Sequence, residues 1–367
     1  MKQAQPLAGL TTDEIRREIA TAAELPAYRG AQIAEWLYRK ARLGEGGGGS
    51  AAFENMSDLP KDARRLLSES LRLMPLTAVS EQRDPHDATV KVLARLLNGS
   101  HPIECVLLPD EKRVSVCLST QAGCPMACAF CATGTQGLTR NLTAGEIVGQ
   151  YLLLQGLTER RISHVVLMGM GEPLLNYDAV LKAIHLLNTE CGIAMRSITL
   201  STVGIVPNID KLAAENLQIT LAVSLHAPNN DLRTRLVPVN KTYPLERLIP
   251  ACRRYADATH RRLTFEYVLL SDVNDRAADA AELATLLRGV PGAVNIIPYN
   301  ATTVGQPFTR PDPSRIRAFR ATLEQAGITV TQRKERGRQI AAACGQLVTQ
   351  IARSSSATVG PELSDGG

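Results

Sequence analysis

Three cysteines, Cys124, Cys128 and Cys131, stand close together in one stretch that begins at Gly123. Their spacing lets three thiolates from a single loop converge on one metal centre. Four ligands close a structural zinc site or a fully ligated iron–sulfur cube, so three ligands leave one position open. Zinc loops usually carry paired Cys-x-x-Cys motifs, whereas here Phe130 precedes the last cysteine of a Cys-x-x-x-Cys-x-x-Cys pattern. The pattern favours a [4Fe–4S] cluster with one open iron over a zinc loop with a distant fourth ligand, or over three unrelated core thiols.

This cysteine stretch closely resembles the signature of the radical S-adenosylmethionine (SAM) superfamily. The resemblance implies that the amine and carboxylate of SAM chelate the open iron. One electron from the cluster then breaks the sulfonium C–S bond and gives a 5′-deoxyadenosyl radical, which takes hydrogen from unactivated C–H bonds. In such a protein the cofactor supplies the chemistry, and the chain supplies placement and the exclusion of water.

A second glycine-rich motif runs from Met168 to Pro173, directly after a predicted strand. Gly171 permits close approach of the backbone to a ligand, and the carboxylate of Glu172 suits an ammonium group. Alone this motif would be a tight turn, but in radical SAM enzymes a Gly-Glu-Pro motif contacts the amine of SAM. Polar groups follow further predicted strands, in the segments Ser201-Thr202 and Ser224-Leu225-His226 and at Asn300. Any one of them suits a helix cap or loop, so their recurrence at strand ends is what indicates a ligand site.

The elements that must position these residues alternate regularly. The predicted strands are 113–118, 164–168, 197–201, 218–225, 264–270 and 294–298, each followed by a loop or helix, with a last strand at 328–332. Six βα units predict an α/β fold, a parallel sheet curled into a partial (β/α)6 barrel. Such folds keep their active sites in loops at the carboxyl ends of the strands, and the cysteine loop follows the first strand.

A small helical domain is predicted before the barrel, with helices at 12–23, 31–42 and 60–71 and a flexible glycine loop at 44–50. The third helix carries Arg64 and Arg65, and exposed arginines on small helical units often contact nucleic-acid backbones. A solvated helical cap is an equally good interpretation. The basic segment 333–338, which holds Arg333, Lys334, Arg336 and Arg338, is a second candidate for contacts with phosphates.

Two apolar runs, 88–97 and 103–108, flank Asn98-Gly99 and predict a β-hairpin, with Glu104 in the return strand. We therefore expect a helical accessory domain with these candidate nucleic-acid contacts at 1–78, a β-hairpin extension at 79–110, a radical SAM core at 111–353 and a disordered tail at 354–367.

The composition of the chain is that of a globular protein, with 44% hydrophobic and 21% charged residues among 367. A net charge of +5 is compatible with a polyanionic partner without proving one. No apolar run approaches the ~18 residues of a membrane span, and the N-terminus lacks a signal-peptide core. We expect a cytoplasmic protein, where eight cysteines suit metal binding or catalysis better than a disulfide framework.

Two lone cysteines carry further information. Cys117 stands at the end of the first barrel strand, and Cys344 follows the basic segment in a glycine-containing setting. A lone cysteine is most often a buried structural residue. These two, however, occupy positions that would both face the mouth of one barrel.

With these cysteines, a set of short segments resembles the RlmN/Cfr family of RNA adenine methyltransferases over roughly residues 10 to 350. The segments are 103–104, 116–117, 123–131, 140–142, 168–176, 201–202, 224–228, 297–300 and 343–346. The glycine loop at 44–50 and the tail beyond 353 look peculiar to this chain.

The family resemblance implies a mechanism that consumes two SAM molecules. Cys344 takes a methyl group from one SAM, and a radical from the second SAM takes hydrogen from that S-methyl group. The methylene radical adds to an adenine carbon, and Cys117 then forms a disulfide with Cys344 and releases the base. Glu104 matches the proton acceptor of the family. Cys124, Cys128 and Cys131 match the cluster ligands, and the SAM contacts match Gly171, Glu172, Ser201, Ser224, Leu225, His226 and Asn300.

The resemblance also implies partners: 23S rRNA, tRNA and an electron donor such as a flavodoxin, with a monomeric protein and no membrane. Methylation at C2 of adenine is favoured because Gly171 to Asn176 looks like the C2 branch. Three alternatives stay open: a cysteine-rich nucleic-acid-binding module without catalysis, another radical SAM enzyme such as an activase or a sulfur-inserting protein, and the Cfr branch, which methylates C8 and confers antibiotic resistance. Cys117 and Cys344 disfavour an activase, which needs neither.

Overall fold

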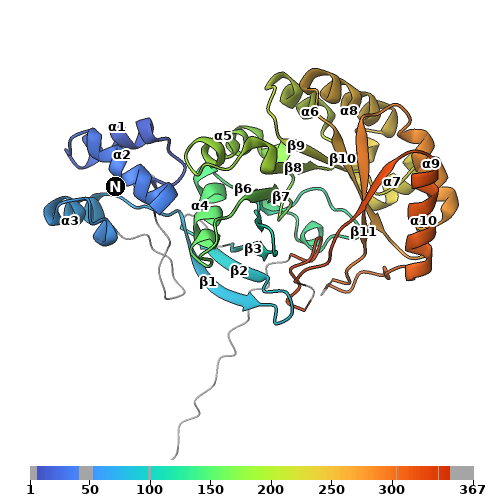
Figure 1. Cartoon of the computed structure of the whole chain (residues 1–367), viewed down its shortest axis with the longest axis horizontal. Helices are drawn as coiled ribbons and strands as arrows, with labels where there is room; N and C mark the ends of the chain where they lie inside the picture. The colour runs from blue at the N-terminus through green and yellow to red at the C-terminus, as the bar shows by residue number, and fades with distance from the viewer. Residues whose placement is uncertain (1–5, 41–52, 98–100, 303, 338, 348–367) are drawn as a thin grey trace, which may run out of the picture.

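A ten-stranded sheet forms the centre of the computed structural model, which describes residues 6–40, 53–97, 101–302, 304–337 and 339–347 (Figure 1). The strand order is β1-β2-β3-β4-β7-β8-β9-β10-β11-β12, and the pairs from β4 to β12 are all parallel. The parallel strands are β4 (Val114–Cys117), β7 (His164–Leu167), β8 (Ile198–Thr202), β9 (Thr220–Ser224), β10 (Leu263–Leu269), β11 (Gly292–Pro298) and β12 (Thr329–Gln332). The predicted glycine loop at 44–50, the Asn98-Gly99 turn, Arg338 and the tail at 354–367 lie outside the described residues.

Helices follow these strands and cover the outer face of the curled sheet (Figure 1). They are α4 (Ala144–Gln155), α5 (Tyr177–Thr189), α6 (Val206–Ala214), α7 (Asn230–Leu236), α8 (Leu245–Thr259), α9 (Ala277–Leu286) and α10 (Pro313–Gln325). Central strands are apolar because helices bury one of their faces; Leu221, Ala222 and Val223 of β9 are fully buried. The structure confirms the predicted α/β fold, in which a parallel sheet curls into a partial barrel. No helix in the described part of the chain is long and apolar enough to cross a membrane.

An antiparallel extension continues the barrel sheet beyond β4. It consists of β1 (Leu76–Arg83), β2 (Val90–Leu96) and β3 (Ile103–Pro109), and β3 pairs antiparallel with β4. The predicted hairpin corresponds to β2 and β3. The strand β1 was not predicted, because its polar, mostly exposed residues form no apolar run. The expected domain boundary at 78/79 falls inside this strand.

The N-terminal helices pack together and dock on the barrel next to α5 (Figure 1). They are α1 (Thr12–Ala22), α2 (Tyr28–Glu35) with a π-helical turn at Trp36–Lys40, a short 3-10 turn at Phe53–Asn55, and α3 (Lys61–Ser70). Helix α1 begins with a capping box in which Thr11 and Glu14 satisfy each other's backbone amides. Glu14 also pairs with Lys182 of α5 at 2.9 Å, so the first turn of the domain is tied to the barrel.

Candidate active site

The cysteine loop lies between two short strands, β5 (Gln121–Gly123) and β6 (Leu138–Asn141), which pair with each other. Gly123 has a φ of +78°, and a Cβ there would lie 2.0 Å from the carbonyl oxygen of Gly137. The amide of Cys124 donates to that same carbonyl at 2.7 Å. On the far side of the loop, the amide of Ala129 donates to Leu236 O at 2.9 Å. The loop is therefore fixed at both ends, and only glycine fits its first turn.

Cys124, Cys128 and Cys131 line one cavity of about 140 Å³ at the carboxyl ends of the strands. Burial raises the pKa of Cys124 to about 12, and the nearby Cys131 thiol adds to this effect. Within the described ranges, no group of three or more His, Cys, Asp and Glu side chains forms a ready-made site for a metal ion. The donor set nevertheless fits an iron–sulfur cluster, because three thiols of one loop face the same cavity, and metal coordination would deprotonate them.

Several of the predicted SAM contacts line this same cavity. They are Gly171, Glu172, Ser201, Ser224, His226 and Asn300. Leu225 is fully buried, and its amide donates to Glu266 O at 3.0 Å, so it supports the cavity from the core. Asn300 Oδ1 is buried without a hydrogen-bond partner among the described residues, which leaves an acceptor for a ligand.

Glu172 has a carboxylate that the backbone holds from two directions. Its Oε1 accepts from the amide of Leu174 at 3.0 Å, and its Oε2 accepts from the amide of Val203 at 2.8 Å. The side chain is 2% exposed, and burial raises the pKa of Glu172 to about 7 despite these donors. At Gly171, with φ at +106°, a Cβ would lie 2.6 Å from Gln121 Cβ. The motif thus presents a fixed, buried carboxylate that a cationic group would stabilise.

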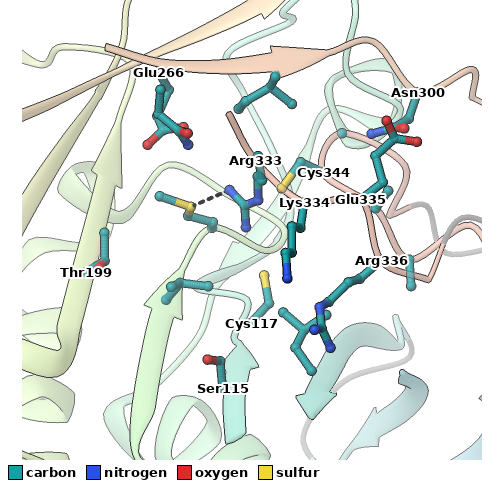
Figure 2. A pocket seen from close by; sticks show the side chains of 18 of the residues that line it. Ser115, Cys117, Thr199, Glu266, Asn300, Arg333, Lys334, Glu335, Arg336 and Cys344 are labelled. Atoms are coloured by element: carbon teal, nitrogen blue, oxygen red, sulfur yellow. Dashed lines mark hydrogen bonds between the residues drawn. The ribbon is translucent and has the colours of Figure 1, made fainter. Parts of the chain in front are cut away.

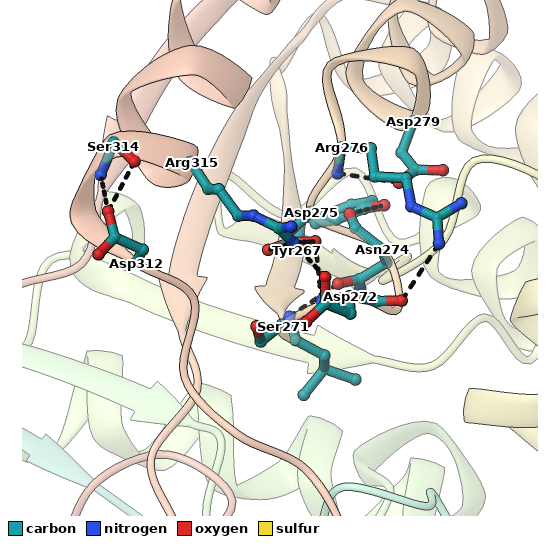
Figure 3. A network of polar contacts seen from close by, with 11 residues as sticks. Tyr267, Ser271, Asp272, Asn274, Asp275, Arg276, Asp279, Asp312, Ser314 and Arg315 are labelled. Carbon is teal, nitrogen blue, oxygen red and sulfur yellow. Dashed lines mark hydrogen bonds and ion pairs between the residues drawn. The ribbon is translucent and has the colours of Figure 1, made fainter.

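His226 is held in one orientation by its neighbours. Its Nδ1 accepts from the amide of Val268 at 3.0 Å, and its ring meets Phe130 of the cysteine loop edge to face at 4.7 Å. Burial lowers the pKa of His226 to about 3, so the ring is neutral, and the Nδ1 acceptor leaves Nε2 as the donor. Asn274 donates to the carbonyl of His226 at 2.8 Å, and Figure 3 shows the loop after β10 in which Asn274 lies. Such a neutral donor suits the polar edge of a bound nucleoside.

Cys117 and Cys344 line a second, larger cavity of about 550 Å³ inside the barrel. Figure 2 shows both sulfur atoms in this cavity with Arg333 beside them. Cys344 also lines the smaller cavity, so its thiol lies where the two spaces adjoin. Polar side chains of successive strands line the larger cavity, namely Ser115, Thr199, Thr220, Thr264, Asn295 and Thr331. The larger cavity thus connects the two lone thiols with a row of polar side chains on the inner face of the barrel.

The disulfide implied between Cys117 and Cys344 is not formed in this structure. All eight cysteines lie in the described residues and are free. Burial raises the pKa of Cys117 to about 12, and burial also raises the pKa of Cys344. The guanidinium of Arg333 opposes both shifts, because a positive charge favours the thiolate.

The segment that carries Cys344 is anchored on two sides. Gly345, with φ at +81°, accepts from the amide of Ala132 at 2.8 Å, directly after Cys131. Gln346 donates to the carbonyl of Ala301 at 2.6 Å. These contacts tie the Cys344 loop to the cysteine loop and to the segment that follows Asn300.

Glu104 lies in β3, buried at 5% exposure. Its Oε1 pairs with Lys91 Nζ at 3.0 Å, and the same ammonium lies 3.4 Å from the carbonyl oxygen of Ala341. The extension therefore brings this carboxylate to the base of the Cys344 segment, held by a lysine that sequence analysis did not single out.

Two further buried charged residues of the site, besides Lys91, were missed from sequence. Glu266 lines both cavities and accepts from Asn295 Nδ2 at 2.8 Å; burial raises its pKa. A charged residue inside the apolar strand Phe265–Tyr267 is the signal that would have found it. Arg233 of α7 is fully buried behind the cysteine loop. It stands among other polar residues, so no comparable signal marks it in the sequence.

The fold and the cysteine loop define a radical SAM protein, and residues 118–284 match the family model of the radical SAM superfamily. A "probable dual-specificity RNA methyltransferase RlmN" of Thermosynechococcus vestitus is 48% identical, covering 88% of this chain and 92% of its own. A protein of the same name from Picosynechococcus is 46% identical, and the match covers 96% of this chain and 98% of that protein. The crystal structure of a radical SAM methyltransferase from Sphaerobacter thermophilus is similar, with a TM-score of 0.87 and 46% identity. The match covers 94% of this chain and 99% of the chain in that structure. The chain belongs to the RlmN family.

Proposed function

We propose that this protein is a radical SAM methyltransferase that methylates C2 of a specific adenine in 23S rRNA, and an adenine of the tRNA anticodon loop, through a methyl-cysteine at Cys344. One observation carries the proposal: Cys117 and Cys344 line the same cavity, and Cys344 also lines the cavity of the cysteine loop. Neither a nucleic-acid-binding module nor a simple activase has use for two such thiols.

The cluster belongs at Cys124, Cys128 and Cys131, and SAM belongs beside it among Gly171, Glu172, Ser201, Ser224, Leu225, His226 and Asn300. When bound, the cluster and SAM supply a hydrogen-abstracting radical. The residues of the chain position SAM. The Glu172 carboxylate accepts hydrogen bonds from its amino group, while the neutral His226 ring and the free Asn300 Oδ1 offer a donor and an acceptor.

Cys344 carries the methyl group and Cys117 resolves the adduct. In its first step Cys344 attacks the methyl carbon of SAM, and its proton must leave. Arg333 supports this step because its guanidinium favours the thiolate form of both cysteines. Later the Cys117 thiolate attacks the Cys344 sulfur: the disulfide forms, the carbon–sulfur bond to the base breaks, and the released methylene carbon takes up a proton to become the methyl group of the base. Glu104, held by Lys91, accepts the proton that the adenine carbon gives up.

RNA is the proposed substrate on three grounds. The relatives carry the name of a dual-specificity RNA methyltransferase, the chain has a net charge of +5, and the helical domain presents the exposed Arg65 beside the barrel. Adenine also explains the unusual chemistry, because its amidine carbons are electrophilic and cannot attack a sulfonium methyl directly. A flavodoxin-like donor, a monomeric state and a cytoplasmic location complete the proposal.

Nucleoside analysis of large-subunit rRNA tests the proposal. The RNA comes from cells that lack the modification and is incubated with reconstituted enzyme, SAM and a reductant. We expect 2-methyladenosine from the wild type, none from Cys344→Ala, and the wild-type amount from the matched control Cys191→Ala, whose thiol is buried elsewhere. If 8-methyladenosine is the main product, the protein belongs functionally to the alternative branch. If no methylated adenosine forms, the proposal is wrong.

A further inference from the structure

Arg233 is a fully buried cation whose hydrogen-bond partners are neutral. Its Nε donates to Leu225 O at 3.2 Å, and its Nη1 donates to Asn240 Oδ1 at 2.9 Å. Its Nη2 donates to Val203 O at 2.6 Å and to Ser224 O at 3.2 Å. Among the described residues, no carboxylate forms an ion pair with this guanidinium. Burying a charge without a counter-charge is costly, so the site calls for an anion.

The guanidinium lies directly behind the cysteine loop. Helix α7, which carries Arg233, accepts at Leu236 O a hydrogen bond of 2.9 Å from the amide of Ala129, the residue after Cys128. Burial lowers the pKa of Arg233 to about 10, and the Cys128 thiolate acts in the opposite direction. Arg233 thus stays protonated at neutral pH, and its charge acts on Cys128.

We infer that Arg233 is a positioning residue that provides the counter-charge of the cluster and makes the cluster easier to reduce. The inference rests on the proposed cluster at Cys124, Cys128 and Cys131. A cluster with three thiolate ligands carries net negative charge, and reduction adds one more electron. A fixed positive charge in a buried site stabilises the more negative state, and local charge and hydrogen bonding set the potentials of such clusters.

A second effect of Arg233 is geometric and separable from its charge. Arg233 holds the carbonyl of Val203, while the amide of Val203 donates to Glu172. Arg233 also holds the carbonyls of Ser224 and Leu225, next to His226. The same side chain therefore fixes the ends of β8 and β9 where SAM is proposed to bind. Loss of the forked guanidinium would loosen these ends, even if a charge remained.

The test compares Arg233→Gln, Arg233→Lys and the matched control Arg235→Gln in full-length, anaerobically reconstituted protein. Arg235 lies on the same helix but is exposed, so its charge is screened by solvent. The readouts are iron content, the midpoint potential from an EPR-monitored redox titration, and SAM affinity. We expect Arg233→Gln to disfavour reduction at least tenfold, about 59 mV more negative for one electron. Arg233→Lys should keep the midpoint potential within about 59 mV of the wild type but bind SAM more weakly. Arg235→Gln should change neither the potential nor the SAM affinity.

If Arg233→Gln does not fold, Asn240→Asp provides the measurement with Arg233 in place. The new carboxylate would lie next to Nη1 and neutralise the guanidinium, so the potential should fall, while Asn240→Leu should leave it unchanged. Wild-type potential in Arg233→Gln, or in Asn240→Asp, overturns the inference while leaving the proposed function intact. A wild-type protein that binds no cluster at all overturns the proposed function, and with it the inference.

Discussion

Binding of SAM should depend on pH through one buried carboxyl, that of Glu172. Its pKa is raised from 4.5 to about 7 because burial disfavours the charged form. A shift of this size corresponds to about 3 kcal/mol between the two protonation states, at about 1.4 kcal/mol per unit. Because the folded-state pKa is raised, the protein without SAM loses this stability as the pH rises from the unfolded-state pKa through 7. The amino group of SAM donates hydrogen bonds to the carboxylate and recovers part of that free energy.

The ionised carboxylate is the stronger hydrogen-bond acceptor, so the part of the SAM affinity that Glu172 contributes follows its ionised fraction. With a pKa near 7 that fraction rises from about one tenth at pH 6 to about one half at pH 7. The amine of SAM gives up its proton when it coordinates the open iron, and this adds the same pH dependence to every variant. We therefore expect the dissociation constant of SAM to fall about fivefold more in the wild type than in Glu172→Gln between pH 6 and pH 7.

Isothermal titration calorimetry of SAM into anaerobic, reconstituted enzyme at pH 6.0, 6.5 and 7.0 measures this dependence. Glu172→Gln should bind weakly and lack this part of the pH dependence, because an amide does not ionise in this range. Glu266→Gln is the matched control, since it removes the other buried carboxyl of the cavity and should keep the slope of the wild type. A wild-type profile no steeper than that of Glu172→Gln, or a slope that Glu266→Gln abolishes, would refute the assignment of Glu172 as the group that contacts the amine of SAM.

Three further outcomes follow from the site and its surroundings. Cys128→Ser should lower the iron content and abolish SAM cleavage, and full iron with normal cleavage would remove the cluster assignment. Gly171→Ala should lower the free energy of unfolding by about 3 kcal/mol in urea, because its φ is +106° and the new methyl group meets Gln121; an unchanged midpoint would contradict this. Arg65→Glu should weaken RNA binding and flatten its salt dependence, whereas an unchanged salt slope would mean that this arginine only faces solvent.

The sequence predicted the barrel because parallel strands are apolar runs and their helices are amphipathic or capped. Thr143 and Glu146, for example, form the capping box that opens α4. Strand β1 and the β5–β6 ribbon were missed for the opposite reason, since tertiary pairing rather than local pattern forms them. The structure also shows β1 to β3 as one continuation of the barrel sheet, which a hairpin pattern does not reveal.

The sequence marks the candidate site residues more clearly than the residues that support them. Most of the predicted SAM contacts and the three loop cysteines line one cavity, because each follows a strand end at the same edge of the sheet. Lys91, Arg233 and Glu266 were missed, although each holds or faces a residue of the site. Their roles come from burial among groups that are distant in sequence, and no local spacing encodes that.

The central claim is that Cys344 becomes covalently joined to an adenine and that Cys117 releases it. The most direct measurement is mass spectrometry of Cys117→Ala protein purified from cells under denaturing conditions and digested with ribonuclease and protease. We expect Cys117→Ala to give a peptide in which Cys344 is linked through a methylene group to adenosine. The wild type and Cys117→Ala/Cys344→Ala should give no such adduct. A Cys344 peptide that is methylated but carries no nucleoside would contradict the role of Cys117. A Cys344 that is never methylated would contradict the mechanism as a whole.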